Sequence, residues 1–197
     1  MADRLLAAAG ALDRAILDSD PASAAEVTVR ILNGLAIVAV VARRGQREAL
    51  AAKVLDAFGL ALPDCPRFVE GAALSALATG PDAWLFTARS DDPAWAEGLA
   101  RALRGLASVA DQSDAYVAVR VAGPQAQALL SRGVGLDLHD QAFPVGAGAV
   151  TSVAHLGLIL WRCEAEAYDL LSFRSYADNV WLWLKETGAD FGLRAVR

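Results

Sequence analysis

The sequence has 197 residues, a net charge of −5 at pH 7 and a hydrophobic fraction of 55%. Nucleic-acid binding depends on clustered Lys and Arg side chains, so the acidic balance argues against a nucleic-acid partner. Only two cysteines occur, and neither belongs to a CxxC or Cys/His cluster. We therefore expect neither a disulfide framework nor a structural zinc site.

The longest apolar run, residues 35–42, is far shorter than the roughly 20 residues that a membrane-spanning helix requires. Asp3 and Asp13 interrupt the N-terminal Leu and Ala residues, which is not typical of a signal peptide. These features predict a cytoplasmic protein without a membrane segment. The high apolar content indicates either a surface for a partner or simply the abundance of alanine.

The first predicted element is a helix within residues 1–20, which we expect to cover the rest of the fold. Its apolar residues recur at helical spacing: Leu5, Ala9, Leu12 and Ile16. Residues 27–32 and 35–42 then read as strands rich in β-branched side chains. Because Asn33-Gly34 separates them, they predict a β-hairpin with a buried second strand.

A helix follows Gly45 and ends at Gly59, which supplies a left-handed terminating position. Its inward face carries Leu50, Val54 and Phe58. Residues 72–78 and 84–88 predict two further strands. Asp92 and Pro93 then predict the cap and first residue of a second helix. The inner face of this helix is expected to carry Trp95, Leu99, Leu103 and Leu106.

After Gly105 the order of elements begins again. Strands are predicted at residues 108–110, 115–121, 149–154, 158–163 and 168–173. A helix after Gly123-Pro124 places Ala126, Leu129 and Leu130 inward. The last helix is predicted from a capping box, Ser175 with Asp178, and from Gly188 as its stop. Its inward face is expected to include Ala177, Val180, Trp181 and Leu184.

Both halves, about residues 27–105 and 106–190, thus show the order strand, strand, helix, strands, helix. This repetition predicts an α+β fold that arose by duplication. Neither half has enough strands to cover both faces of its sheet, so we expect the two sheets to share a core within one globular domain.

No catalytic constellation is convincing. His155 and Cys163 fall in one predicted hairpin, so a Cys–His nucleophile pair is one hypothesis. The alternative is a buried thiol and a histidine that bonds only to the backbone. Residues 111–114 form the densest polar group between two strands. They are interpreted as an Asx or Ser turn, with a ligand-binding Asp111 as the alternative.

Trp181 and Trp183 lie two positions apart on the last predicted helix, so they cannot both face inward. We expect one of them to be exposed. Exposed tryptophan often anchors a partner, which makes this pair our candidate for a protein interface. A locally thick core or an irregular helix end is the alternative.

Four groups of residues occur in order and span most of residues 27–190. They are residues 79–85; residues 110–113 with 120–124 and 129–130; residues 135–139 with 143–144; and residues 173–177 with 181–184. Together they resemble the gamma subunit family of heterotetrameric sarcosine oxidase. The N-terminal helix has no counterpart in this resemblance.

The resemblance implies a fold similar to the folate-binding domain of the glycine-cleavage T protein, with two swapped, ferredoxin-like ββαβββα halves. It also implies a flavoenzyme complex that oxidatively demethylates sarcosine or a related N-methyl amino acid. Larger alpha and beta subunits would hold FAD, FMN, NAD and tetrahydrofolate, with a delta subunit completing the complex. The gamma subunit would be structural, with no catalytic, cofactor-binding or metal-binding residue on this chain.

Two alternatives from other classes stay open. The first is a stand-alone tetrahydrofolate-binding or aminomethyltransferase-like protein, suggested by the shared fold and by Asp111. The second is a small-ligand regulatory module of the ferredoxin-like type, which would form symmetric homodimers.

Overall fold

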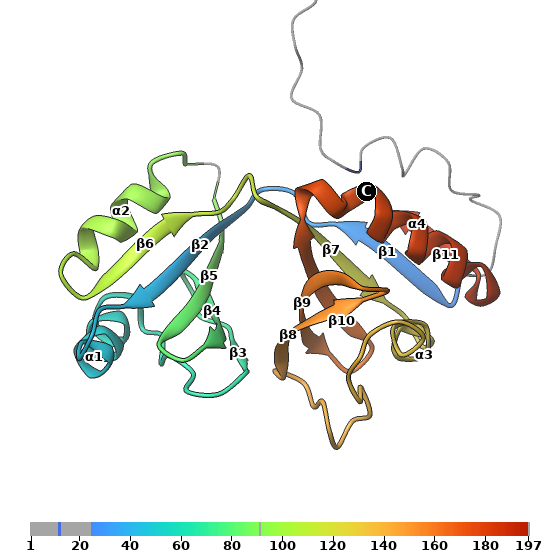
Figure 1. Cartoon of the computed structure of the whole chain (residues 1–197), viewed down its shortest axis with the longest axis horizontal. Helices are drawn as coiled ribbons and strands as arrows, with labels where there is room; N and C mark the ends of the chain where they lie inside the picture. Colours follow the sequence, from blue (N-terminus) through green and yellow to red (C-terminus); the bar gives the residue numbers. More distant parts are fainter. Residues whose placement is uncertain (1–11, 13–24, 91, 197) are drawn as a thin grey trace, which may run out of the picture.

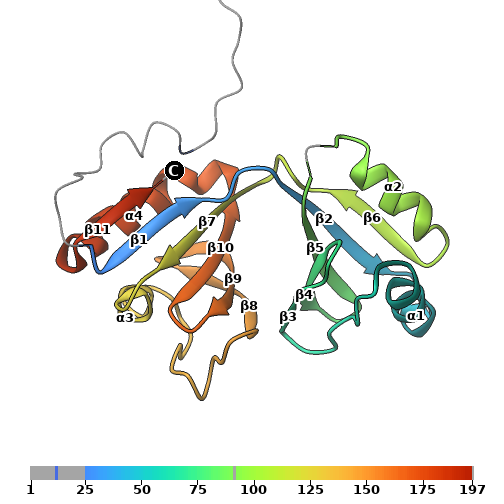
Figure 2. The ribbon, with the colours of Figure 1, turned by 180° about the vertical axis from the view of Figure 1, so that it is seen from behind.

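The computed structural model describes residue 12, residues 25–90 and residues 92–196. The predicted N-terminal helix lies outside these residues except for Leu12, which is buried in the apolar core. Two lobes lie side by side, each built on one twisted sheet with its helices on the outer face (Figure 1). The same arrangement is seen from behind in Figure 2. Among the described residues, no helix combines the length and apolarity needed to cross a bilayer.

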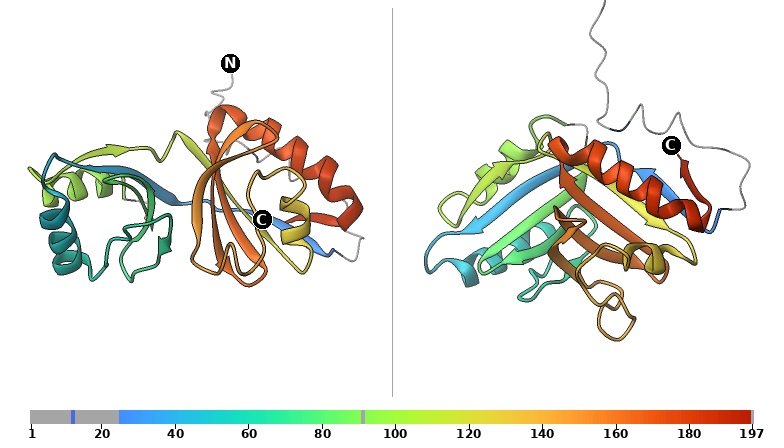
Figure 3. Two further views of the ribbon diagram at one scale, coloured as in Figure 1. Left: turned by 60° about the horizontal axis from the view of Figure 1, so that its bottom comes forward. Right: turned by 45° about the vertical axis from the view of Figure 1, so that its right-hand side comes forward.

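The larger sheet has six strands in the order β11-β1-β7-β10-β9-β8. Its strands are β1 (Val27–Ile31), β7 (Tyr116–Ala122), β8 (Gly148–Val153), β9 (Leu156–Glu164), β10 (Ala167–Phe173) and β11 (Leu193–Val196). The pairing of β1 with β11 is parallel, and the other pairings are antiparallel. Helices α3 (Ala126–Leu130) and α4 (Ala177–Gly188) cover its outer face, with α4 running along the sheet (Figure 3).

The smaller sheet has five strands in the order β3-β4-β5-β2-β6. Its strands are β2 (Leu35–Ala42), β3 (Phe68–Val69), β4 (Ser75–Gly80), β5 (Ala83–Arg89) and β6 (Ala107–Asp111). Its outer face is covered by α1 (Arg47–Phe58) and α2 (Trp95–Ala102). The coarse prediction of a mixed α+β fold is therefore confirmed.

The predicted hairpin of residues 27–42 is wrong. Strand β1 pairs with β7 and β11, whereas β2 pairs with β5 and β6 in the other sheet. A two-residue type I′ turn needs positive φ at both central residues, but Asn33 is not among the positive-φ residues and Gly34 alone has φ 67°. The amide of Leu32 instead donates to the carbonyl of Ala118 at 2.9 Å, so the chain follows β7 before crossing to the other lobe.

The two sheets meet face to face through an apolar layer to which both contribute. Alternation along β5 places Leu85 in this layer, while Trp84 and Phe86 pack with the residues of α1 and α2. On the other side, Ile159 and Trp161 of β9 face the same layer. The rings of Phe68 and Trp161 stack across the junction with centroids 4.9 Å apart. The packing of each sheet therefore depends on the other.

Helix termini show where the local signals succeed. Gly59 has φ 65° and its amide donates to the carbonyl of Leu55, which confirms the predicted end of α1. Helix α2 begins at Trp95 and not at Pro93. The Asp92 carboxylate accepts a bond from the amide of Ala94 at 2.8 Å, so it stabilises the turn before the helix.

The predictions for the last helix need two corrections. Residues Arg174–Tyr176 form a 3-10 turn, η2, and no side chain caps α4, so the capping box of Ser175 and Asp178 does not form. Gly188 has φ −76° and the chain continues into a second 3-10 turn, η3 (Ala189–Phe191). The left-handed residue is Gly192, at φ 60°, and it leads into β11, which we did not predict.

Candidate functional site

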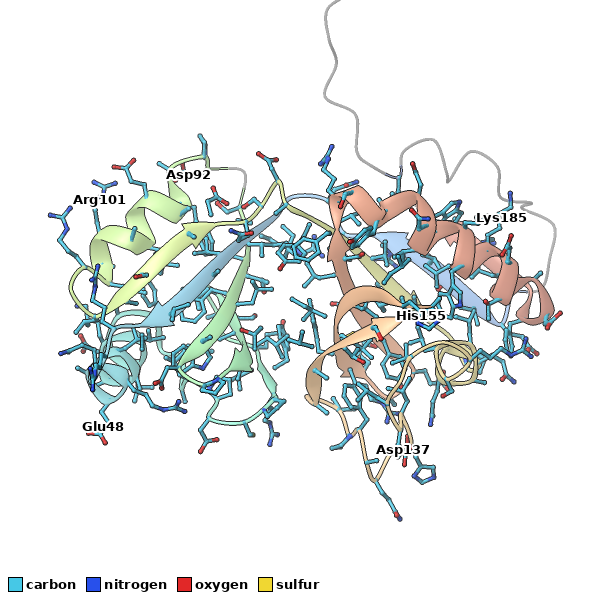
Figure 4. All side chains as sticks on the ribbon, in the orientation of Figure 1. Glu48, Asp92, Arg101, Asp137, His155 and Lys185 are labelled. Atoms are coloured by element: carbon cyan, nitrogen blue, oxygen red, sulfur yellow. The ribbon has the colours of Figure 1, made fainter. Side chains whose placement is uncertain are left out.

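A cavity of about 320 Å³ lies between the two sheets, and we name it the inter-sheet cavity. Its polar lining comes from β4, β5 and the residue after β3 in the smaller sheet, and from β7, β9 and β10 of the larger one. These side chains are Glu70, Ser75, Thr87, Arg89, Arg120, Cys163 and Asp169. The stacked rings of Phe68 and Trp161 also line it. Side chains of both lobes meet in this region in Figure 4.

Arg120 and Asp169 form the strongest polar contact in the cavity wall. They are cross-strand partners on β7 and β10, so the sheet register places them opposite each other. Arg120 donates to both carboxylate oxygens, from Nε at 2.6 Å and from Nη2 at 2.9 Å. This bond to Asp169 raises the pKa of Arg120 above its ordinary value. The bidentate pair compensates a carboxylate whose side chain is only 6% exposed.

Cys163 is a neutral thiol and not a nucleophile. Burial raises its pKa to about 12, and the thiol donates to the carbonyl of Ala167 at 3.2 Å. His155 lies in the turn between β8 and β9, at the opposite end of β9 from Cys163. Eight residues of strand separate two residues by about 26 Å, so the hypothesis of a Cys–His pair is wrong. The alternative was a buried thiol with a histidine that bonds only to the backbone, and Cys163 is indeed partly buried. Figure 4 labels His155, which is exposed, as is His139.

Residues 111–114 form the turn that we favoured over a ligand site. The Asp111 carboxylate accepts bonds from the Ser113 hydroxyl at 2.7 Å and from the Ser113 amide at 2.9 Å. These two bonds lower the pKa of Asp111. The Ser113 hydroxyl also accepts a bond from the amide of Ile37 on β2 at 3.0 Å. Asp111 thus fixes the connection between β6 and β7. No group of three His, Cys, Asp or Glu side chains with metal-site geometry occurs in the part of the chain that the structure describes.

The expectation that Trp181 or Trp183 faces solvent is not met. Both indoles are half-buried against the core of the six-stranded sheet. The Trp183 ring packs on the backbone of Gly133, where an added Cβ would lie 2.5 Å from Cζ2. This glycine widens the surface that α4 can cover, so two tryptophans fit where helical spacing alone allows one. The exposed apolar residue between them is Leu182, at 52%.

An exposed aromatic group appears at the end of the larger sheet, and we name Tyr116, Phe173 and Tyr176 the aromatic patch. Phe173 is 46% exposed and Tyr176 is 40% exposed. The Phe173 ring stacks on Tyr116 with centroids 5.0 Å apart and meets Tyr176 edge-on at 6.3 Å. We did not predict this patch, because it depends on the register that pairs Phe173 of β10 with Tyr116 of β7.

Comparison with known proteins agrees with the fold. Residues 44–190 match the model of the Sarcosine oxidase, gamma subunit family. The sarcosine oxidase subunit gamma of Corynebacterium sp. (strain U-96) is 29% identical over 148 residues, which cover 74% of this chain and 72% of that protein.

Solved structures give the same result. A chain of the heterotetrameric sarcosine oxidase from Corynebacterium sp. U-96, in complex with pyrrole 2-carboxylate, superposes with a TM-score of 0.82 at 26% identity. The match covers 96% of this chain and 99% of that one. The glycine cleavage system aminomethyltransferase T from Bartonella henselae has a TM-score of 0.65 at 14% identity over 87% of this chain and 48% of that chain, which shows a shared fold alone. The family match extends over more than half of the sequence, and the chain belongs to the sarcosine oxidase gamma subunit family.

Proposed function

We propose that this chain is the gamma subunit of a sarcosine oxidase-type complex and that its role is to dock on larger, flavin-bearing subunits. The observation that carries the proposal is the family match over residues 44–190. The similarity to a chain of a solved heterotetrameric complex supports it as well, because the match covers 99% of that chain.

The docking surface in this proposal is the aromatic patch. Large aromatic side chains that stay half exposed are enriched at protein interfaces and are often the residues on which binding depends most. Phe173 and Tyr176 belong to none of the buried apolar clusters, and both leave a large part of their rings exposed to solvent. Trp181 and Trp183 remain the alternative docking residues, reached through the face of α4 that exposes Leu182.

The complex that we propose is cytoplasmic and oxidatively demethylates sarcosine or a related N-methyl amino acid. In it, the alpha and beta subunits hold FAD, FMN, NAD and tetrahydrofolate, and a delta subunit is the fourth chain. The gamma subunit itself would hold no cofactor. The similarity to a chain of a solved heterotetrameric sarcosine oxidase supports this assignment of partners.

We further propose that the domain arose by duplication of a ββαβββα unit, with its halves near residues 27–105 and 106–190. The sheet order supports this origin, because β1 lies beside strands of the second half and β6 beside strands of the first. Such an exchange of one strand between halves would bind them into one domain.

A stand-alone tetrahydrofolate-binding protein or aminomethyltransferase is not favoured. The resemblance to aminomethyltransferase T is at 14% identity and carries only the fold. The residue that motivated this alternative, Asp111, is occupied by the hydrogen bonds of its own turn.

Affinity purification from the organism that encodes the chain tests this proposal. The tagged wild-type chain is expected to retain larger flavin-containing chains, and the double variant F173S/Y176S is expected to retain about tenfold less. Serine at these exposed positions removes apolar area without opening a core cavity, so the fold is preserved. The amount of each retained chain is measured by mass spectrometry and by flavin absorbance.

Two single variants serve as controls. Leu55 of α1 is 54% exposed on the other lobe, so L55S should retain the partners as the wild type does. L182S tests the α4 face that carries Trp181 and Trp183. Loss of the partners with L182S and not with F173S/Y176S would assign docking to that face, and the aromatic patch would be rejected. Purification of the wild-type chain without any flavoprotein would reject the subunit role itself.

A further inference from the structure

We propose that Asn33 is a site of spontaneous covalent modification, at which the side-chain amide is lost through ring closure with the next residue. This goes beyond the docking role of the chain. Asn33 and Gly34 form the bend between β1 and β2, where the chain crosses from one lobe to the other (Figure 1). The Asn-Gly pair that wrongly predicted a hairpin therefore lies on a connection between the lobes.

The first argument is the backbone amide of Gly34. It donates a hydrogen bond to no described residue, whereas the amide of Leu32, two positions earlier, donates to the carbonyl of Ala118 at 2.9 Å. Glycine has no Cβ, so its own side chain does not shield this nitrogen from the preceding residue. The nitrogen is therefore accessible to an electrophilic carbon nearby.

The second argument is the position of the Asn33 side chain. Asn33 and Gly34 are both exposed, and the Asn33 amide forms no hydrogen bond within the part of the chain that the structure describes. Together with Arg89 and Ser90 they line an open hollow of about 400 Å³. Water and hydroxide therefore reach the bend, and the unbonded side chain can rotate toward the Gly34 nitrogen.

The chemistry that follows is a ring closure and a hydrolysis. The Gly34 nitrogen loses its proton to solvent base and attacks Cγ of Asn33, so an N–Cγ bond forms. The Cγ–Nδ2 bond breaks, and Nδ2 leaves as ammonia after it takes a proton from water. A water molecule then opens the succinimide ring. Cleavage of the new N–Cγ bond leaves aspartate, whereas cleavage of the original peptide bond leaves isoaspartate, whose main chain runs through the side-chain carboxyl carbon.

Asn179, the other asparagine of the sequence, provides an internal comparison. It is also exposed, but it lies within α4 and precedes Val180, a β-branched residue that is only 2% exposed. The helix fixes the backbone on both sides of Asn179, and the branched side chain shields the nitrogen of Val180. We therefore expect modification at Asn33 and not at Asn179.

Incubation of the folded full chain, followed by mass spectrometry of its peptides, tests this site. The peptide that contains Asn33 should gain the mass difference between an amide and a carboxyl group, and the peptide that contains Asn179 should not. The initial rate should rise at least about tenfold between about pH 6 and about pH 8, because the attacking nitrogen must first lose its proton. Isoaspartate is identified by its methylation with an isoaspartyl methyltransferase and labelled S-adenosylmethionine.

A synthetic peptide of residues 30–36 gives the reference rate, because it has no fold to restrain the bend. Asn33 of the folded chain should react within about tenfold of the rate in the peptide, since the fold leaves both reacting groups unbonded. A rate in the folded chain that is lower than this, or that equals the rate at Asn179, would overturn the proposal.

The variant N33Q is the matched control. It keeps an amide at the same exposed position, where folding is not at risk, but its longer side chain closes a larger ring and reacts more slowly. Ion-exchange chromatography of incubated wild-type chain should show a growing acidic species, and N33Q should show little of it. If N33Q forms this species as fast as the wild type does, the modification lies elsewhere in the chain and the proposal is wrong.

Discussion

Two arginines, Arg162 and Arg120, are held by buried contacts. Arg162 is only 4% exposed, and its Nη1 donates to the carbonyl of Phe143 at 3.0 Å and pairs with Asp140 at 2.7 Å. Its Nη2 donates to the carbonyl of Ala165, so one side chain ties two loops to β9. Arg120 joins β7 to β10 by donating to both oxygens of the Asp169 carboxylate. Buried charges are expensive unless bonded, and here the bonds account for their burial.

The two cysteines should differ sharply in reactivity. Cys65 is exposed, whereas burial raises the pKa of Cys163 to about 12. Only the thiolate attacks disulfide reagents, and at pH 8 on the order of one Cys163 thiol in ten thousand is ionised. Ellman's reagent should therefore label one thiol per folded chain quickly and the second only after denaturation.

The variant C65S provides the control for this labelling. Folded C65S should show no fast labelling, and its remaining thiol, Cys163, should react only after denaturation. Fast labelling of folded C65S at pH 8 would show that Cys163 is accessible and ionised, in conflict with the environment described for it.

At the scale of elements, periodicity and β-branched runs located most strands and helices of the described chain. Gly59 ends α1 as expected because its signal is local. The predictions fail where pairing with a segment distant in sequence determines the structure. Asn33-Gly34 predicts a hairpin, but β1 pairs with β7 and β11 and not with β2. Strand β11 has only four residues and depends on β1 as its parallel partner, so its own sequence carries a weak signal.

The contact of α4 with the turn after α3 yields a test at this scale. A Cβ at Gly133 would lie 2.5 Å from the Trp183 ring, which is rigid and held by the core. G133A should therefore lower the free energy of unfolding by about 2 kcal/mol through overpacking. Chemical denaturation with urea measures this change.

Gly135 offers the matched control, because a Cβ there meets no atom within 4 Å. G135A should leave the free energy of unfolding within about 0.5 kcal/mol of the wild type. If G133A unfolds at the same urea concentration as G135A, Trp183 is not packed on this turn, and its role as an interface residue gains weight.

At the scale of the whole molecule, the site could be predicted only in part. The motifs that indicate the subunit family follow one another along the chain, so the family could be predicted from the sequence alone. The aromatic patch and the inter-sheet cavity were not visible. Each needs residues far apart in sequence, such as Tyr116 with Phe173 or Thr87 with Arg120, to be placed by strand register and sheet packing.

The most direct test of the subunit role is sedimentation velocity of material purified through this chain from its natural source. Absorbance is followed both for protein and in the visible band of flavin, and the chains in each boundary are identified. We predict one boundary in which this 20.6 kDa chain moves with flavin-bearing subunits at a mass well above its own. A boundary in which the chain moves alone, with the flavin absorbance in a separate boundary, would contradict the assignment.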